Sequence, residues 1–115
     1  MQQNHIVNPT IETVMQHGQK NDTIECNFKT YSLVERTERT VLIERILHNR
    51  KINLHIEEVS GGEMNGMYLV DLSVIDKEDT ITVTNYFEQK LRIAQLIHFL
   101  GYRGIKLMNE VFCPT

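Results

Sequence analysis

The sequence predicts an α+β protein in which two similar strand–helix–strand segments share one hydrophobic core. Three observations lead to this prediction. Residues 85–111 have the pattern of a buried helix followed by a strand, and several shorter stretches alternate apolar and polar residues as half-buried strands do. The two halves of the chain also resemble each other at an offset of 53 residues, because the string L-x-x-R-x-I-x-L begins at both Leu47 and Leu100.

These observations predict a ferredoxin-like sandwich in the order β-α-β-β-β-α-β, with an extra strand and a short N-terminal helix. Parallel strands joined by a helix cross over in a right-handed sense, which restricts how two such units combine. The alternative fold is an antiparallel β-meander with a C-terminal helix. The 115 residues are predicted to form a single domain, residues 1–115, with a loose polar stretch at residues 1–7.

The first half of the chain begins with a short predicted helix. Asn8 suits the cap, Pro9 suits the first helical position, and Gly18 suits the end. The apolar face of this helix would consist of Ile11, Val14 and Met15. Residues 19–22 read as a loop. Residues 23–31 are predicted to form one half-buried strand, because Ile24, Cys26 and Phe28 alternate with polar residues.

Residues 33–49 allow two interpretations. Ser32 and Glu35 have the spacing of a capping box, which favours a helix. The apolar residues form no single helical face, however, and the run from Val41 to Ile43 suits a strand, so a strand hairpin is the alternative. The offset favours the helix because it aligns this stretch with the C-terminal helix.

The second half of the chain has clearer boundaries. Residues 51–58 and 67–75 are predicted strands, and the second is central because it is apolar on both faces. Residues 60–66 and 76–79 are turns, and residues 80–84 form a short strand. The C-terminal helix is predicted over residues 86–100, with Asn85 as its cap and Gly101 at its end. A strand would then follow from Ile105.

Composition is that of an ordinary globular protein, with 41% hydrophobic and 23% charged residues. A net charge of −3 argues against binding dominated by phosphate contacts. The chain shows no signal-peptide pattern and no apolar run long enough for a membrane, so we expect a cytoplasmic protein without a membrane partner. The two cysteines, Cys26 and Cys113, fit a buried thiol and a tail thiol, and whether they pair is left open.

No catalytic residue, metal site or cofactor is predicted. The glycines of residues 60–66 lack the spacing of a nucleotide-binding loop and precede a strand. The five histidines lack zinc-site spacings. An enzyme remains an alternative hypothesis, which would require a pocket that holds His55 or His98 beside an acidic side chain.

The C-terminal helix carries the predicted interface. Phe99 falls on the polar stripe of the helix with Arg92, and Tyr102 and Arg103 follow it. We therefore predict a protein-binding module that acts as an inhibitor, an immunity or accessory factor, or a self-associating regulator. Its partner would be another protein or a second copy of the chain. The competing interpretation places Phe99 in the core.

Nucleic-acid binding is the alternative function. It would use the sheet face with the cations Arg50, Lys51 and Lys106. The aromatic residues available for base stacking on that face would be Phe28, Tyr31 and Tyr68.

Overall fold

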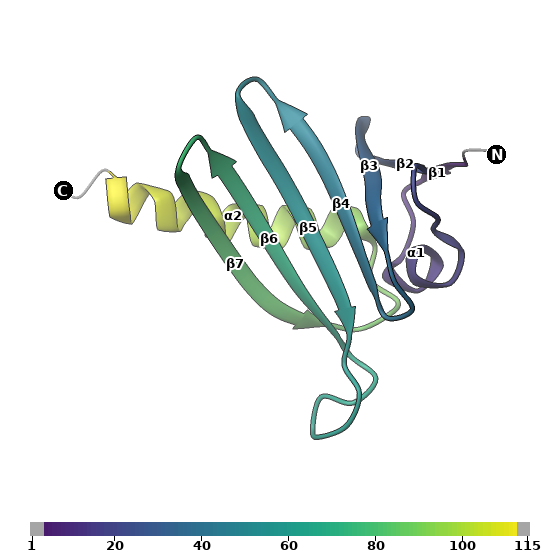
Figure 1. The fold of residues 1–115 in the computed structure, drawn as a ribbon. Helices are drawn as coiled ribbons and strands as arrows, with labels where there is room; N and C mark the ends of the chain where they lie inside the picture. Colours follow the sequence, from purple (N-terminus) through teal and green to yellow (C-terminus); the bar gives the residue numbers. More distant parts are fainter. Residues whose placement is uncertain (1–3, 113–115) are drawn as a thin grey trace.

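The computed structural model describes the backbone of residues 4–112 and the side chains of residues 4–106. Within this range the chain forms one seven-stranded sheet and two helices (Figure 1). The elements in chain order are β1 (His5–Val7), α1 (Ile11–His17), β2 (Thr23–Cys26), β3 (Lys29–Arg36), β4 (Thr40–Leu47), β5 (Arg50–Glu58), β6 (Tyr68–Asp76), β7 (Asp79–Phe87) and α2 (Ile93–Phe112).

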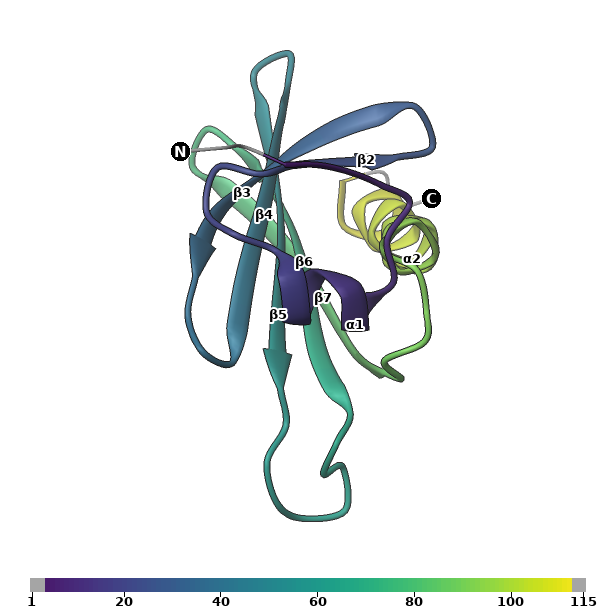
Figure 2. The same ribbon diagram turned by 90° about the vertical axis from the view of Figure 1, so that its right-hand side faces the viewer.

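The strands lie side by side in the order in which they occur in the chain. Strand β1 pairs in parallel with β2, and every later neighbouring pair is antiparallel. Helix α2 packs across one face of this sheet, which we call the inner face, and lies behind the sheet in Figure 1. Figure 2 shows α2 nearly end-on, with the sheet on one side of it and α1 close to both.

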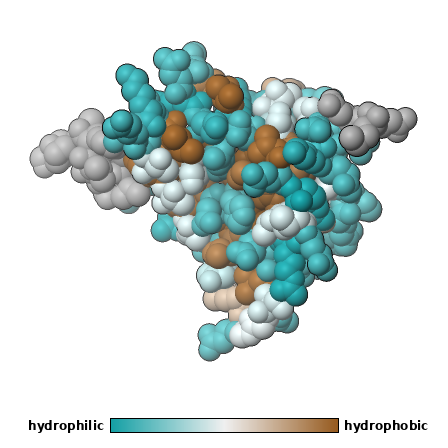
Figure 3. Space-filling view, in the orientation of Figure 1, coloured by the Kyte–Doolittle hydropathy of each residue, from teal (hydrophilic) through white to brown (hydrophobic). Residues whose placement is uncertain are grey.

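The hydrophobic core lies between the inner face, α2 and α1. Alternate residues of a strand point to opposite faces, so Leu54 and Ile56 point into the core whereas His55 and Glu57 point outward. The fully buried side chains from both helices and the sheet are Ile11, Val14, Ile24, Leu33, Val41, Ile43, Leu54, Ile56, Val70, Ile93, Leu96 and Leu100. The opposite, outer face is mostly hydrophilic, with scattered hydrophobic residues (Figure 3).

The predicted ferredoxin-like sandwich is wrong. Residues 33–47 do not form a helix but belong to β3, β4 and the turn between them, and residues 48–49 form the turn to β5, so the strand–helix–strand segment predicted there is absent. In the described chain, the helix that connects two parallel strands is α1, between β1 and β2. Val41 and Ile43 alternate toward the core opposite Ile56 and Leu54 of β5, and this strand pairing outweighs the local capping signal of Ser32 and Glu35. The observed meander order is that of the alternative fold, apart from the parallel β1 and the helix α1.

The boundaries of the C-terminal helix also differ from the prediction. Residues 85–87 extend β7, where Phe87 pairs with Tyr68, and α2 begins only at Ile93. Gly101 does not end the helix but lies within it, and the strand predicted from Ile105 is the continuation of α2. Residues 105–112 therefore belong to α2, and β7 is the last strand of the sheet in the described chain.

The short helix α1 is confirmed, with a different cap from the predicted one. Its N-cap is Thr10 rather than Asn8, and the Thr10 hydroxyl accepts a hydrogen bond from the Thr13 N–H at 3.1 Å. The first two N–H groups of the helix, those of Ile11 and Glu12, donate hydrogen bonds to the backbone carbonyls of residues 91 and 89, respectively. The segment before α2 therefore satisfies the free donors at the start of α1 and joins α1 to residues 89–91.

Asp22 is a buried polar residue in the segment predicted as a loop. Its carboxylate accepts hydrogen bonds from the backbone N–H groups of Asn4 at 3.0 Å and Gln19 at 2.8 Å. Hydrogen bonds to a charged group are stronger than neutral ones. Asp22 therefore fixes both the start of β1 and the loop after α1, and β1 includes residues 5–7 of the stretch expected to be loose.

Candidate functional site

Three of the four predicted interface residues share one stripe of α2, at the i, i+3 and i+4 spacing that places side chains on one side of a helix. Phe99 is 45% exposed and Tyr102 is 69% exposed. The Arg103 guanidinium lies over the Phe99 ring, 5.9 Å from its centroid. Lys106 continues the stripe one turn later and is also exposed. We call these four residues, Phe99, Tyr102, Arg103 and Lys106, the α2 outer stripe.

Phe99 is held from below by the sheet. Its ring meets the Phe87 ring of β7 edge-to-face, with centroids 5.8 Å apart and an angle of 87° between the ring planes. Phe99 therefore packs at the margin of the core and still presents nearly half of its surface. The contact with Phe87 and the cation above the ring restrict the orientation of this aromatic side chain.

Arg92, the fourth predicted residue, lies elsewhere. It immediately precedes α2, and its guanidinium donates a hydrogen bond to the backbone carbonyl of Asn8. Arg92 therefore helps to hold the N-terminal segment against the start of α2 and is separated from the α2 outer stripe by about two helical turns.

The cations of the nucleic-acid alternative do not form a common surface. Arg50 forms an ion pair with Asp76 at 3.2 Å on the inner side of the sheet. Lys51 points outward, 3.7 Å from Glu44. Lys106 belongs to the α2 outer stripe. Of the aromatic residues, Tyr31 and Tyr68 are buried and Phe28 projects from the β2–β3 turn, so these rings form no stacking platform.

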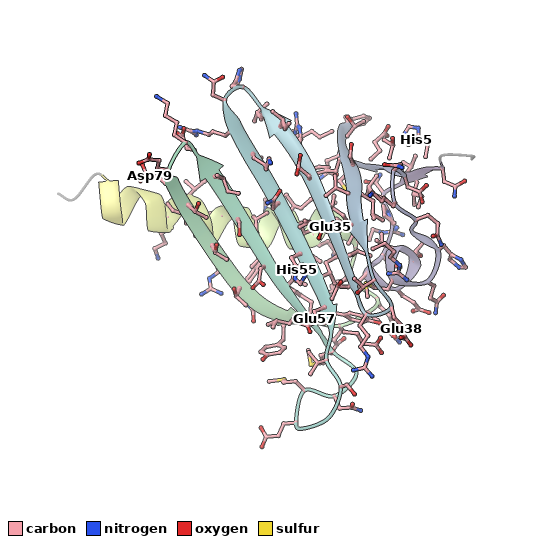
Figure 4. The ribbon with its side chains drawn as sticks, in the orientation of Figure 1. His5, Glu35, Glu38, His55, Glu57 and Asp79 are labelled. Atoms are coloured by element: carbon pink, nitrogen blue, oxygen red, sulfur yellow. The ribbon has the colours of Figure 1, made fainter. Side chains whose placement is uncertain are left out.

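Polar residues on the outer face are dispersed. Glu35, His55 and Glu57 lie on β3 and β5, whereas Glu38 and Asp79 lie near turns at opposite ends of the strands (Figure 4). His55 Nδ1 and Asp71 Oδ2 are 4.0 Å apart on an open surface. Among the described residues, no three histidine, cysteine or acidic side chains converge as metal ligands.

A groove runs along α2 beside the end of the β2–β3 hairpin. It has a volume of about 330 Å³, and its lining includes Cys26, Tyr31 and His98. None of the described residues that line it is acidic, so His98 lacks there the acidic partner that the enzyme hypothesis requires. Burial raises the pKa of the Tyr31 phenol, and the adjacent Arg45 opposes this rise.

Cys26, which lines this groove, is buried, and its thiol forms no disulfide with any of the described residues. Burial raises its pKa from 9.0 to about 11, and the neighbouring Glu25 carboxylate adds to the rise. The thiol is therefore neutral at physiological pH and unsuited to act as a nucleophile. Cys113, the other cysteine of the chain, lies outside the described residues.

The raised pKa predicts slow and strongly pH-dependent alkylation of Cys26. In a Cys113→Ser variant, the rate of reaction with iodoacetamide should rise about tenfold per pH unit up to about pH 11, because only the thiolate reacts. Between pH 9 and pH 11 the unfolded state loses this proton before the folded state does, so stability should fall with rising pH. Mass spectrometry of quenched samples measures the rate, with urea-unfolded protein as the reference.

A rate that levels off near pH 9 in the folded protein would contradict this assignment. The control for the stability measurement is Cys26→Ala, in which the fall between pH 9 and pH 11 should be smaller. The tyrosines Tyr31 and Tyr68 would still contribute in that variant, because burial raises both of their pKa values.

In the described part of the chain, neither helix has the length and apolarity needed to cross a bilayer. Comparison with known proteins found no matching family model, no similar curated protein and no similar solved structure.

Proposed function

We propose that this chain is a protein-binding module, acting as an inhibitor, accessory factor or regulator, whose partner docks on the α2 outer stripe. The observation that carries the proposal is the exposed Phe99 ring, held by Phe87 below and covered by Arg103 above. Aromatic and arginine side chains supply most of the binding energy in protein interfaces, above all when their orientation is restricted before binding.

The positive charge of the α2 segment indicates which kind of partner surface would fit it. From Gln89 to Asn109 the sequence contains four lysine and arginine residues and no acidic residue, although the whole chain has a net charge of −3. No carboxylate of the described residues forms an ion pair with Arg103 or Lys106. An acidic surface with an apolar pocket for Phe99 and Tyr102 would therefore complement the stripe. The compartment proposed for this interaction is the cytoplasm, as expected from the sequence.

The experiment compares variants of the immobilised full chain in capture from native lysate, followed by affinity measurement with the purified captured protein. Tyr102→Ala and Arg103→Glu should each weaken binding about tenfold or more, as truncation of a hot-spot residue does. The matched controls are Phe28→Ala, which removes an aromatic that is 97% exposed on the β2–β3 turn, and Lys51→Glu on the outer face. Both controls should stay within about twofold of the unmodified chain.

The proposal would be overturned if the control and stripe variants lost binding affinity equally, or if neither stripe variant lost affinity. Sedimentation velocity of the purified chain identifies the case in which the partner is a second copy. In that case the stripe variants should lower the fraction of dimer while Phe28→Ala leaves it unchanged.

A further inference from the structure

A largely apolar chamber lies between the inner face of the sheet and the second half of α2. Its volume is about 310 Å³. The sheet contributes aliphatic side chains from four strands, and α2 covers them from above. The aliphatic lining residues are Leu47, Ile52, Leu72, Val74, Ile81, Val83, Ile97 and Ile105. This chamber lies beyond the well-packed core, which is centred on the first half of α2 at Ile93, Leu96 and Leu100.

The charged residues of the chamber are all cationic. Lys29, Arg45 and Arg50 line it, and no acidic residue is among its described lining. Arg50 is partly neutralised by Asp76 at 3.2 Å. Lys29 and Arg45 have no ion-pair partner among the described residues, and Arg45 instead lies over the Tyr31 ring, 5.8 Å from its centroid. An otherwise aliphatic space in an acidic protein thus carries a local excess of positive charge.

Two glycines of α2 leave this space open. Gly101 and Gly104 both line the chamber, although glycine is unfavourable in the interior of a helix. A Cβ atom at Gly101 would meet no atom within 4 Å, and one at Gly104 would only reach ordinary contact with Val83 at 3.6 Å. Close backbone packing therefore does not require these glycines, and their visible effect is to keep volume free beneath the helix.

The chamber adjoins the groove described above. Lys29, Tyr31, Ile97, Gly101 and Ile105 line both spaces, so the groove provides a route from solvent to the aliphatic interior. The two cations without an acidic partner lie on the part of the sheet next to this route, since Lys29 begins β3 and Arg45 lies on the adjacent β4. A molecule that entered here would meet positive charge first and hydrocarbon beyond it.

We propose that the chamber binds a small amphipathic carboxylate with a hydrocarbon body of about ten carbon atoms. A cavity of about 150 Å³ accommodates benzene, so 310 Å³ accommodates a body about twice as large. The carboxylate accepts hydrogen bonds from Arg45 and Lys29, and the hydrocarbon lies against Ile81 and Ile105 under α2. None of the four residues of the α2 outer stripe lines the chamber, and only Tyr102 lines the groove that leads to it, so this inference does not rest on the proposed function.

The test uses decanoate with the purified full chain, at concentrations below those at which decanoate forms micelles. Calorimetric titration should show saturable binding at one site per chain, and decanol should bind about tenfold more weakly or worse, because it lacks the charge. In ¹H–¹³C methyl spectra, the resonances of Ile52, Ile81, Ile97 and Ile105 should shift, whereas those of Ile46, Ile75 and Ile11 should not.

Two variants test the two halves of the site. Arg45→Gln should weaken decanoate binding about tenfold, whereas the matched control Lys51→Gln should change it less than about twofold, because Lys51 lies on the outer face. Gly101→Leu places a side chain in the chamber and should abolish binding. A cooperative thermal unfolding transition is the criterion that the Gly101→Leu variant is folded.

Absence of saturable binding to the unmodified chain would overturn the proposal. It would also be overturned if decanol bound as tightly as decanoate, if Arg45→Gln and Lys51→Gln had equal effects, or if folded Gly101→Leu bound decanoate normally.

Discussion

Replacement of Leu96 by alanine is expected to lower the free energy of unfolding by about 3–4 kcal/mol, the middle of the range for a fully buried leucine. Leu96 lies between Ile93 and Leu100 on the side of α2 that faces the sheet, and all three side chains are fully buried. Truncation of the Leu96 side chain removes buried apolar surface from the core. It also leaves a cavity between helix and sheet that the surrounding side chains fill only in part. For a chain of this size, the melting temperature should drop by about 10–15 °C.

The matched control for Leu96→Ala is Tyr102→Ala, two turns along the same helix. Tyr102 is 69% exposed, so its replacement should change stability by less than about 0.5 kcal/mol. Urea unfolding followed by circular dichroism measures both variants. If the two variants lost similar stability, α2 would not be docked on the sheet through its Leu96 side. The control also shows that any binding defect of Tyr102→Ala does not arise from unfolding.

Strand positions in the middle of the chain could be predicted because each strand has one buried and one exposed face. Leu54 and Ile56 alternate with His55 and Glu57, and this period of two is readable without knowledge of the fold. The turns predicted at residues 60–66 and 76–79 were predictable for a local reason as well, and the second is found at residues 77–78. Gly61, Gly62, Gly66 and Lys77 adopt positive φ angles there, and a glycine-rich or polar segment favours such conformations.

The β3–β4 hairpin was not predictable from local signals because those signals conflict. Ser32 and Glu35 resemble a capping box, yet Leu33 pairs with Ile43, and a bulge between Leu33 and Glu35 interrupts the alternation that would have revealed the strand. The similarity between residues 47–54 and 100–107 then decided the question wrongly. The first segment forms the end of β4 and the start of β5, whereas the second lies entirely within α2, so the shared string reflects chance.

The candidate sites were predictable only in part. A helical wheel identified Phe99 as an aromatic on a polar stripe, which allowed an interface residue or a core residue. The structure combines features of both, because the Phe99 side chain is 45% exposed and also contacts the Phe87 ring edge-to-face. The chamber had no usable signal in the sequence. Lys29, Arg45 and Ile105 are far apart in the chain, and Gly101 read as a helix end, so its place in the interior of α2 followed only from the structure.

Alanine at two glycine positions should have opposite effects on stability. At Gly18, just after α1, a Cβ atom would lie 2.5 Å from the Val14 carbonyl oxygen and 2.9 Å from a methyl carbon of Leu33. The carbonyl cannot move away, because the Gly18 N–H donates a hydrogen bond of 2.8 Å to that same oxygen. Gly18→Ala should therefore lower the free energy of unfolding by about 2–3 kcal/mol, as overpacking does.

At Gly101 the same substitution should raise the free energy of unfolding by about 0.5–1 kcal/mol, because alanine favours the helix and its methyl group meets no neighbour. Urea unfolding of Gly18→Ala and Gly101→Ala under identical conditions compares the two with the unmodified chain. A loss of stability in Gly101→Ala would show that the space beneath α2 is filled in the folded protein, and the chamber would then have no room for a ligand. A gain in stability, together with retained decanoate binding, would mean that glycine at position 101 makes the helix less stable than alanine would. Lower stability at the position where a ligand needs space is the pattern expected of a binding site.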